Sequence, residues 1–214
     1  MSYVLGVDEA GRGPLAGPVA VGVVMVPEAM QPRLREMFPG VNDSKKLPEK
    51  DRERIYELLV QYSHPNHDLR SPDIRDFVSH DLQMRFCVRF ASAASIDKKG
   101  IVPSVYGCVA RGVKALAPDA AGVRILLDGA LRAPSIYEQE TIIRGDATEA
   151  IISLASIAAK VSRDRLMKRL AKQHPEYGFE VHKGYGTKHH YAMLEKHGCC
   201  IIHRRTFLSS LELG

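Results

Sequence analysis

The chain has 214 residues, 45% apolar and 26% charged, a composition typical of a globular protein rather than a disordered, collagenous or coiled-coil one. Its apolar runs, such as residues 19–26, are far shorter than the roughly 18 residues needed to cross a bilayer, no export signal is visible, and its four cysteines lack disulfide or zinc-site spacing. We therefore expect one large domain, in the cytoplasm, with reduced thiols and a net charge of +5 concentrated near its C-terminus.

The first elements predicted are two strands joined by a loop. Tyr3–Val7 is a short apolar run that ends at Asp8 and Glu9, and Pro18–Val26 is a second run rich in valine. The first two acids of the chain are therefore expected at the end of a strand.

A glycine-rich turn, Gly11-Arg12-Gly13, follows these acids directly. Glycines allow the backbone N–H groups to approach a phosphate or ribose closely, and Arg12 can add a charge-assisted contact. The spacing fits neither a P-loop nor a dinucleotide-binding fingerprint. An ordinary tight turn is the alternative interpretation.

The next predicted element is a helix over Glu49–Tyr62, preceded by Ser44, Lys45 and Lys46. The hydroxyl group, the two ammonium groups and the helix N-terminus can together hold an anion, although a plain helix cap fits the local sequence equally well. From Ser63 to Lys99 the pattern weakens, and we predict only a strand near 67–70 and a helical stretch within 74–92.

The remaining elements alternate between helix and strand. We predict a helix over Ser104–Leu116, a buried strand over Val123–Gly129, a short strand over Thr141–Asp146 and a long helix from Glu149 to about Gln173. This order indicates an α/β domain over residues 1–173. Residues 174–214 are expected to form a C-terminal helical part of the same unit.

Acidic residues follow three of the predicted strands: Asp8 with Glu9, Asp128, and Asp146. Functional groups collect beyond strand ends in open α/β sheets. Four carboxylates that converge there would repel one another unless cations lie between them, and oxygen ligands alone favour Mg²⁺ or Mn²⁺. Two such ions can activate a water molecule and stabilise the leaving oxygen in a phosphoryl displacement. The alternative is that each acid only caps a turn.

Basic residues dominate the C-terminal quarter. Between Lys160 and Arg205 the net charge is +7, and six of the nine histidines lie there, which is expected either of a polyanion-binding face or of a solvated helix surface. Within this quarter Tyr185 stands between two glycines in a basic run. An exposed tyrosine there can lie against a sugar or a base, although buried tyrosines are more common. The histidines lack the acid or cysteine spacing of a zinc site.

Several blocks of the sequence closely resemble the bacterial ribonuclease HII family, the type 2 ribonucleases H. They occur in the family's order and run nearly end to end, with the weakest similarity between Ser63 and Lys99. The blocks are Gly6–Val19, Asn42–Leu47, Leu127–Gly129, Arg144–Asp146, Ala155–Asp164, His182–Thr187 and His203–Phe207.

The resemblance implies a ribonuclease H-like mixed β-sheet flanked by helices, with a C-terminal helical extension. It implies an endonuclease that hydrolyses RNA in RNA·DNA hybrids and cuts 5′ to a single ribonucleotide in duplex DNA, leaving 3′-hydroxyl and 5′-phosphate ends. By the same match, Asp8, Glu9, Asp128 and Asp146 are the catalytic acids that bind Mg²⁺ or Mn²⁺.

The resemblance also assigns the substrate contacts. Gly11, Arg12 and Gly13 match the loop that reads the ribose 2′-hydroxyl, Tyr185 matches the tyrosine that packs on that sugar, and Lys45 and Lys46, with Ser44 beside them, match phosphate contacts. The 2′-hydroxyl is the group that distinguishes a ribonucleotide from its DNA neighbours.

Three other interpretations remain open. The chain begins at its first strand, without the N-terminal extension of the related ribonuclease HIII, which favours HII, but an HIII-like need for several ribonucleotides is the nearest alternative. A non-catalytic nucleic-acid-binding protein and an enzyme of phosphate-sugar metabolism are the others. We expect a monomer with no membrane partner, and the chain shows no motif that would bind a sliding clamp.

Overall fold

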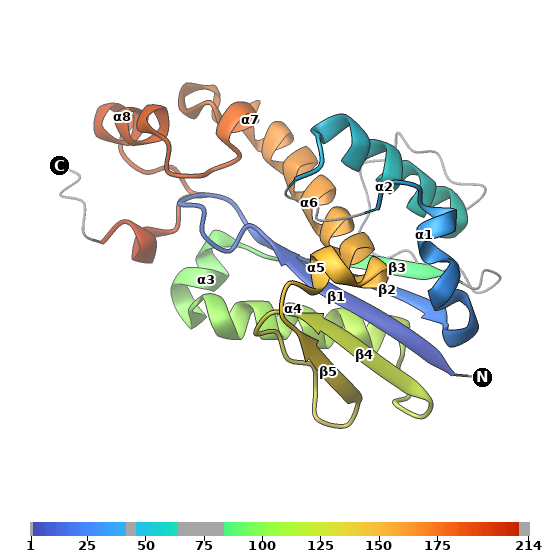
Figure 1. Ribbon diagram of the computed structural model, residues 1–214. Helices are drawn as coiled ribbons and strands as arrows, with labels where there is room; N and C mark the ends of the chain where they lie inside the picture. The colour runs from blue at the N-terminus through green and yellow to red at the C-terminus, as the bar shows by residue number, and fades with distance from the viewer. Residues whose placement is uncertain (1, 42–45, 64–83, 210–214) are drawn as a thin grey trace.

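The computed structural model describes residues 2–41, 46–63 and 84–209. Its centre is a five-stranded sheet in the order β3-β2-β1-β4-β5 (Figure 1). The strands are β1 (Tyr3–Ala10), β2 (Val19–Pro27), β3 (Arg85–Ala91), β4 (Val123–Asp128) and β5 (Glu138–Ile142). β1 pairs antiparallel with β2, and β2 pairs antiparallel with β3, whereas β1–β4 and β4–β5 are parallel pairs. The predicted mixed sheet is confirmed.

Helices cover both faces of the sheet. One face carries α6 (Ala150–Ala171) and α2 (Glu49–Ser63), with η1 (Glu28–Arg33) and α1 (Leu34–Met37) beside them, and the other carries α3 (Ala93–Lys99) and α4 (Ile101–Leu116) (Figure 1). All nine residues of β2 are buried because this inner strand is covered on both sides. None of the helices in the described ranges is both long enough and apolar enough to cross a bilayer.

Two glycines let α6 lie unusually close to the sheet. A Cβ atom at Gly6 of β1 would collide with the Ile151 carbonyl group, and one at Gly22 of β2 would collide with that of Ala155. Ser156, on the same helix, consequently lies beside the end of β1, where its hydroxyl group hydrogen-bonds Asp8. The glycines therefore help to position the chemistry at that strand end.

The C-terminal elements form a third cluster beyond the end of α6. They are η2 (Pro175–Tyr177), α7 (Phe179–His182), α8 (Lys188–His197) and η3 (Arg205–Phe207), which are orange to red in Figure 1. Their apolar side chains pack on Leu15, Ala16, Met167 and Ala171, so this cluster joins both α6 and the loop after β1.

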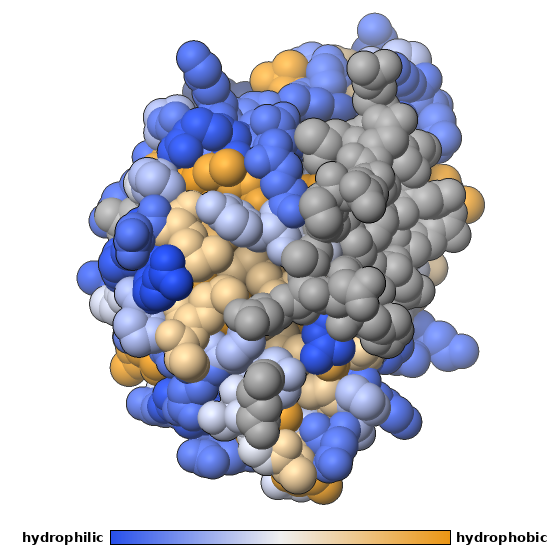
Figure 2. Space-filling view, turned by 90° about the vertical axis from the view of Figure 1, so that its right-hand side faces the viewer, coloured by the Kyte–Doolittle hydropathy of each residue, from blue (hydrophilic) through white to orange (hydrophobic). Residues whose placement is uncertain are grey.

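Hydrophilic side chains form much of the left and lower rim of the side presented in Figure 2, and moderately hydrophobic ones gather toward its middle. Exposed apolar surface is common in folded proteins, and by itself it indicates no particular function.

The structure corrects two details of the sequence interpretation. Residues 85–91 form strand β3, not part of a helix, while the predicted strand at 67–70 lies outside the described residues. The strand near 141–146 is β5, which ends at Ile142. The predicted long helix is α6, and its first turns are buried because they lie between the sheet and α2.

Candidate active site

Three acidic side chains meet at one edge of the sheet. β1 and β4 are adjacent and parallel, so Asp8 near the end of β1 and Asp128 at the end of β4 lie at the same edge. Asp146 joins them from α5 (Gly145–Thr148), a single helical turn after β5. One carboxylate oxygen of each residue lies within 4.8 Å of the other two. The sequence therefore anticipated the meeting of these three acids, although Asp146 lies on a helical turn instead of ending a strand.

The approach of Asp146 to Asp128 depends on the backbone between β5 and α5. Arg144 adopts a left-handed conformation, with φ 58°, and reverses the chain after β5. A Cβ atom at Gly145 would crowd Ile152 and lie 3.6 Å from an oxygen of Asp128. With glycine there, the Asp146 backbone N–H donates to Asp128 Oδ1 at 3.4 Å.

Asp8 is the most confined of the three acids. Its side chain is only 2% exposed; Oδ1 accepts the Glu9 backbone N–H at 2.7 Å, whereas Oδ2 meets no hydrogen-bond donor in the described part of the chain. Burial raises the pKa of Asp8 well above its ordinary value; the hydrogen bond from Ser156 lowers it, and the charges of Glu9 and Asp128 raise it further. A buried carboxylate oxygen without a donor, close to two other carboxylates, fits a divalent cation bound by oxygen ligands.

Glu9 follows Asp8 in the chain but is not among these three converging acids. Strand alternation directs successive side chains to opposite faces. The Glu9 carboxylate instead accepts Arg12 Nη1 at 3.2 Å, within a half-exposed ion pair. Glu9 therefore links the acidic cluster to the glycine-rich turn.

The two glycines of the glycine-rich turn have different surroundings. Gly11 has a φ of 84°, and a Cβ atom there would collide with the Arg163 side chain. A Cβ atom at Gly13 would meet nothing within 4 Å in the part of the chain that the structure describes. Packing within the protein therefore explains Gly11, whereas the open space at Gly13 leaves the backbone accessible to a ligand.

Two buried arginines bind carbonyl groups of the loop that contains this turn, residues 11–18. The sequence analysis missed their role. Arg163 of α6 donates to the carbonyl groups of Ala16, Pro18 and Lys183 at 2.8–3.2 Å. Arg204 donates to three more carbonyl groups, at 2.7–3.0 Å, those of Gly11, Arg12 and Gly17. Burial lowers the pKa of both guanidinium groups, that of Arg204 to about 9, which leaves the side chains charged at neutral pH.

Tyr185 is connected to the same turn. It lies between α7 and α8 with 44% of its surface exposed, and the guanidinium carbon of Arg163 is 5.8 Å from the centre of its ring. The carbonyl group of Gly184 accepts the backbone N–H groups of Leu15 and Ala16 at 2.9 and 3.3 Å. The structure thus brings Tyr185 next to the segment that directly follows the turn, although the two are about 170 residues apart in the chain.

The predicted phosphate contacts are only partly described. Ser44 and Lys45 lie outside the described residues, and Lys46 is exposed just before α2.

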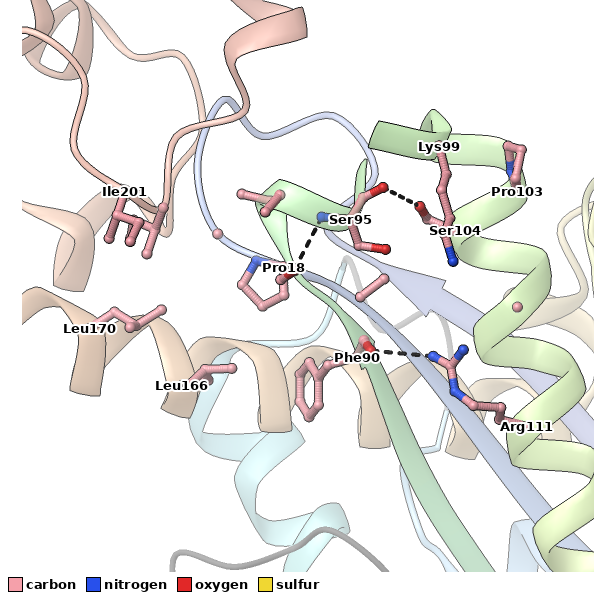
Figure 3. A pocket seen from close by; sticks show the side chains of 17 residues that line it. Pro18, Phe90, Ser95, Lys99, Pro103, Ser104, Arg111, Leu166, Leu170 and Ile201 are labelled. Carbon is pink, nitrogen blue, oxygen red and sulfur yellow. Dashed lines mark hydrogen bonds between the residues drawn. The ribbon is translucent and has the colours of Figure 1, made fainter. Parts of the chain in front are cut away.

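A cavity of about 740 Å³ lies away from these groups, between α3, α4, α6 and the segment at 201–202 (Figure 3). Pro18, Phe90, Leu166, Leu170 and Ile201 form its apolar walls, and the Arg111 side chain donates to the carbonyl group of Phe90 at 3.5 Å on one side. None of the four predicted acids lines it. The chemistry of the acids, not the size of this cavity, therefore locates the candidate active site.

Comparison with known proteins points to one family. The sequence model of the family described as ribonuclease HII matches residues 5–210. A ribonuclease HII of Endomicrobium trichonymphae is 41% identical over 207 residues, which are 95% of this chain and 84% of that protein.

Solved structures agree on the fold. The ribonuclease H2 of Pyrococcus horikoshii superposes with a TM-score of 0.62 at 26% identity, covering 95% of this chain and 93% of that one. The ribonuclease HII solved in a complex with PCNA from Archaeoglobus fulgidus gives a TM-score of 0.73 at 23% identity, covering 98% and 96%. Both therefore have a fold similar to that of this chain over nearly its whole length.

Proposed function

The chain belongs to the ribonuclease HII family of endonucleases, and on that basis we propose that it hydrolyses RNA in RNA·DNA hybrids and nicks duplex DNA 5′ to single embedded ribonucleotides, leaving 3′-hydroxyl and 5′-phosphate ends. The observation that carries this proposal is the convergence of Asp8, Asp128 and Asp146 within 4.8 Å. A protein that only bound a polyanion would gain nothing from clustered negative charge. Phosphodiester hydrolysis accounts for the cluster, because the acids can bind the cations that the reaction uses.

The three aspartates are the proposed ligands of two Mg²⁺ or Mn²⁺ ions, with Glu9 as the fourth. All their donors are hard carboxylate oxygens, which suit these ions better than zinc. When bound, such ions activate water and stabilise the leaving oxygen of the phosphodiester. The chain's own part is to hold the carboxylates together: Ser156 and the Glu9 N–H orient Asp8, and the Asp146 N–H orients Asp128.

Recognition of the ribonucleotide is assigned to the turn Gly11-Arg12-Gly13 and to Tyr185. The backbone at Gly13 is open to a ligand, and the exposed ring of Tyr185 is held next to the same turn through Gly184. The turn and the tyrosine ring lie close to one another, and such a compact site suits a single sugar better than a long stretch of nucleic-acid helix. Residues 174–214, with Ser44, Lys45 and Lys46, are the proposed contacts to the flanking duplex. All proposed site residues come from one chain, so a monomer suffices.

A labelled DNA duplex that carries one ribonucleotide tests this function. We expect one nick on the 5′ side of that ribonucleotide with Mg²⁺ or Mn²⁺ and none with EDTA. Asp146→Asn should abolish the nick, while Asp119→Asn, at an exposed acid that precedes the start of β4 and so lies at the other end of that strand from Asp128, should not. Cleavage of a long RNA·DNA hybrid only would indicate HIII-like specificity. Binding without any cleavage would refute the nuclease assignment.

A further inference from the structure

Three histidines lie buried in the C-terminal cluster, where the basic composition suggested a solvated surface. His182 ends α7, His190 is in the first turns of α8, and His203 follows α8. The rings of His182 and His190 stack with centres 4.5 Å apart, and those of His190 and His203 are 5.3 Å apart. Phe179 packs on all three rings.

The hydrogen bonds of His190 and His203 determine where their protons lie. His190 Nδ1 is 2.9 Å from the carbonyl oxygen of Tyr185, which can only accept, so Nδ1 carries the hydrogen. In the neutral ring Nε2 is then an acceptor, and it lies 3.1 Å from His203 Nε2, which must donate. His203 Nδ1 is left as the acceptor, and it receives the Cys200 backbone N–H at 2.9 Å. Every link has one donor and one acceptor.

This chain of hydrogen bonds exists only while both rings are neutral. A second proton on His190 would place two N–H groups face to face across 3.1 Å, and one on His203 would oppose the Cys200 N–H. Burial, together with the charges of neighbouring histidines, lowers the pKa of each ring to about 4, although the hydrogen bonds with the backbone of Tyr185 and Cys200 act in the opposite direction. The other titratable groups that face the pair are His174, Tyr177, His182, His189 and Cys200.

This series of hydrogen bonds ends at the backbone of Tyr185. Its carbonyl oxygen accepts both His190 Nδ1 and the Thr187 backbone N–H, and its own N–H donates to the carbonyl group of His182 at 2.9 Å. His182 in turn accepts the Gly184 N–H at its Nδ1. The histidines therefore fix the peptide groups on both sides of the Tyr185 side chain.

We propose that His190 and His203 are positioning residues for ribonucleotide discrimination: their fixed tautomers hold the Tyr185 backbone so that its ring meets the sugar beside the glycine-rich turn. The proposal rests on the proposed function, because it deepens the role assigned there to Tyr185. Neither histidine touches the acidic cluster, so their contribution is to specificity and substrate affinity and leaves the hydrolytic step unchanged.

Paired substitutions test the proposal. His190→Leu removes the donor to Tyr185, whereas His190→Asn keeps an amide N–H near the position of Nδ1. We expect His190→Leu to lower kcat/KM on a single-ribonucleotide duplex at least fivefold relative to a long RNA·DNA hybrid, through KM, with kcat on the hybrid within twofold of wild type. His190→Asn should stay within twofold on both substrates. His197→Leu, at an exposed histidine of the same helix, is the matched control.

Imidazole ¹⁵N chemical shifts of the wild-type protein at pH 7.5 provide a test that does not depend on activity or on a variant that folds. We expect the hydrogen of His190 on Nδ1 and that of His203 on Nε2. The opposite tautomers, an equal loss on both substrates in His190→Leu, or an unchanged preference would each overturn the proposal. Absence of nicking by the wild-type protein would instead refute the proposed function, and the ¹⁵N shifts would still judge the tautomers.

Discussion

Replacing Asp8 with asparagine should stabilise the metal-free protein, because the fold buries this carboxylate beside two others and their repulsion costs free energy of folding. Two unit charges 4.8 Å apart, the upper limit of the separations among the three oxygens, repel by about 3.5 kcal/mol at an effective dielectric constant of about 20. Asp8 faces two such charges, which corresponds to a repulsion of about 7 kcal/mol before further screening. Solvent near the less buried Asp128 and partial protonation of Asp8 reduce this, so we expect a gain of roughly 2–4 kcal/mol in the free energy of unfolding.

The assay is urea or thermal unfolding at pH 7.5 in EDTA. For a chain of this size the gain corresponds to a rise in Tm of about 5–10 °C. Glu57→Gln removes an exposed negative charge and should change little. The raised pKa of Asp8 means that its charge destabilises the fold above the unfolded value near 4, so the advantage of Asp8→Asn should shrink as the pH falls toward 4. Added Mg²⁺ should stabilise wild type more than Asp8→Asn. A destabilised Asp8→Asn in EDTA would refute the reasoning.

Four further outcomes are expected. Asp128→Asn should abolish cleavage yet retain hybrid binding, as a nicking assay and a gel-shift titration would show; residual cleavage near wild-type level would contradict this. Tyr185→Ala should lose the preference for a single ribonucleotide more than it loses affinity for a long hybrid, measured as the ratio of kcat/KM values. Arg204→Met leaves three carbonyl groups without their donor and should cost roughly 3–6 kcal/mol in urea unfolding, partly recovered by Arg204→Lys. In the folded protein the pKa values of His190 and His203 are about 4, below the usual 6.5. Their contribution to stability is therefore complete above pH 6.5 and falls as the pH drops toward 4, by about 2 kcal/mol per ring at pH 5. Urea unfolding of wild type and of a double leucine variant at pH 5 and 7.5 would detect this loss of stability.

The meeting of the acids could be predicted because it follows from local patterns. Asp8 and Asp128 each come at or near the end of a buried apolar strand, and parallel neighbours place such ends together. The position of Asp146 could not be predicted in the same way. The chain turns after β5 at Arg144, which has a left-handed backbone conformation. That position is occupied by an arginine, not by the glycine or asparagine that would usually indicate such a conformation in the sequence.

The strand at 85–91 was missed because β3 does not alternate. Its burial is continuous over Phe86–Val88, and it carries arginines at positions 85 and 89, a mixture that resembles one side of a helix as much as a strand. Only pairing with β2 distinguishes the two.

The buried arginines and histidines leave no local signal either. Arg163 and Arg204 are satisfied by carbonyl groups that come from sequence positions 20 to 193 residues away. The pKa of His190 is lowered chiefly because the ring is buried, and its ring partner, His203, lies 13 residues later in the chain. A count of basic residues treats all of these as surface charge, although their partners are inside the protein.

The hydrogen bonds of Arg204 also constrain the order of folding. The carbonyl group of Gly11 accepts a hydrogen bond from a guanidinium group 193 positions later in the chain. Domains generally fold from the N-terminus as they emerge from the ribosome, but this turn cannot gain its bonds to Arg204 until residue 204 has been synthesised. A nascent chain that has not yet reached Arg204 is therefore expected to lack the completed turn beside the acids.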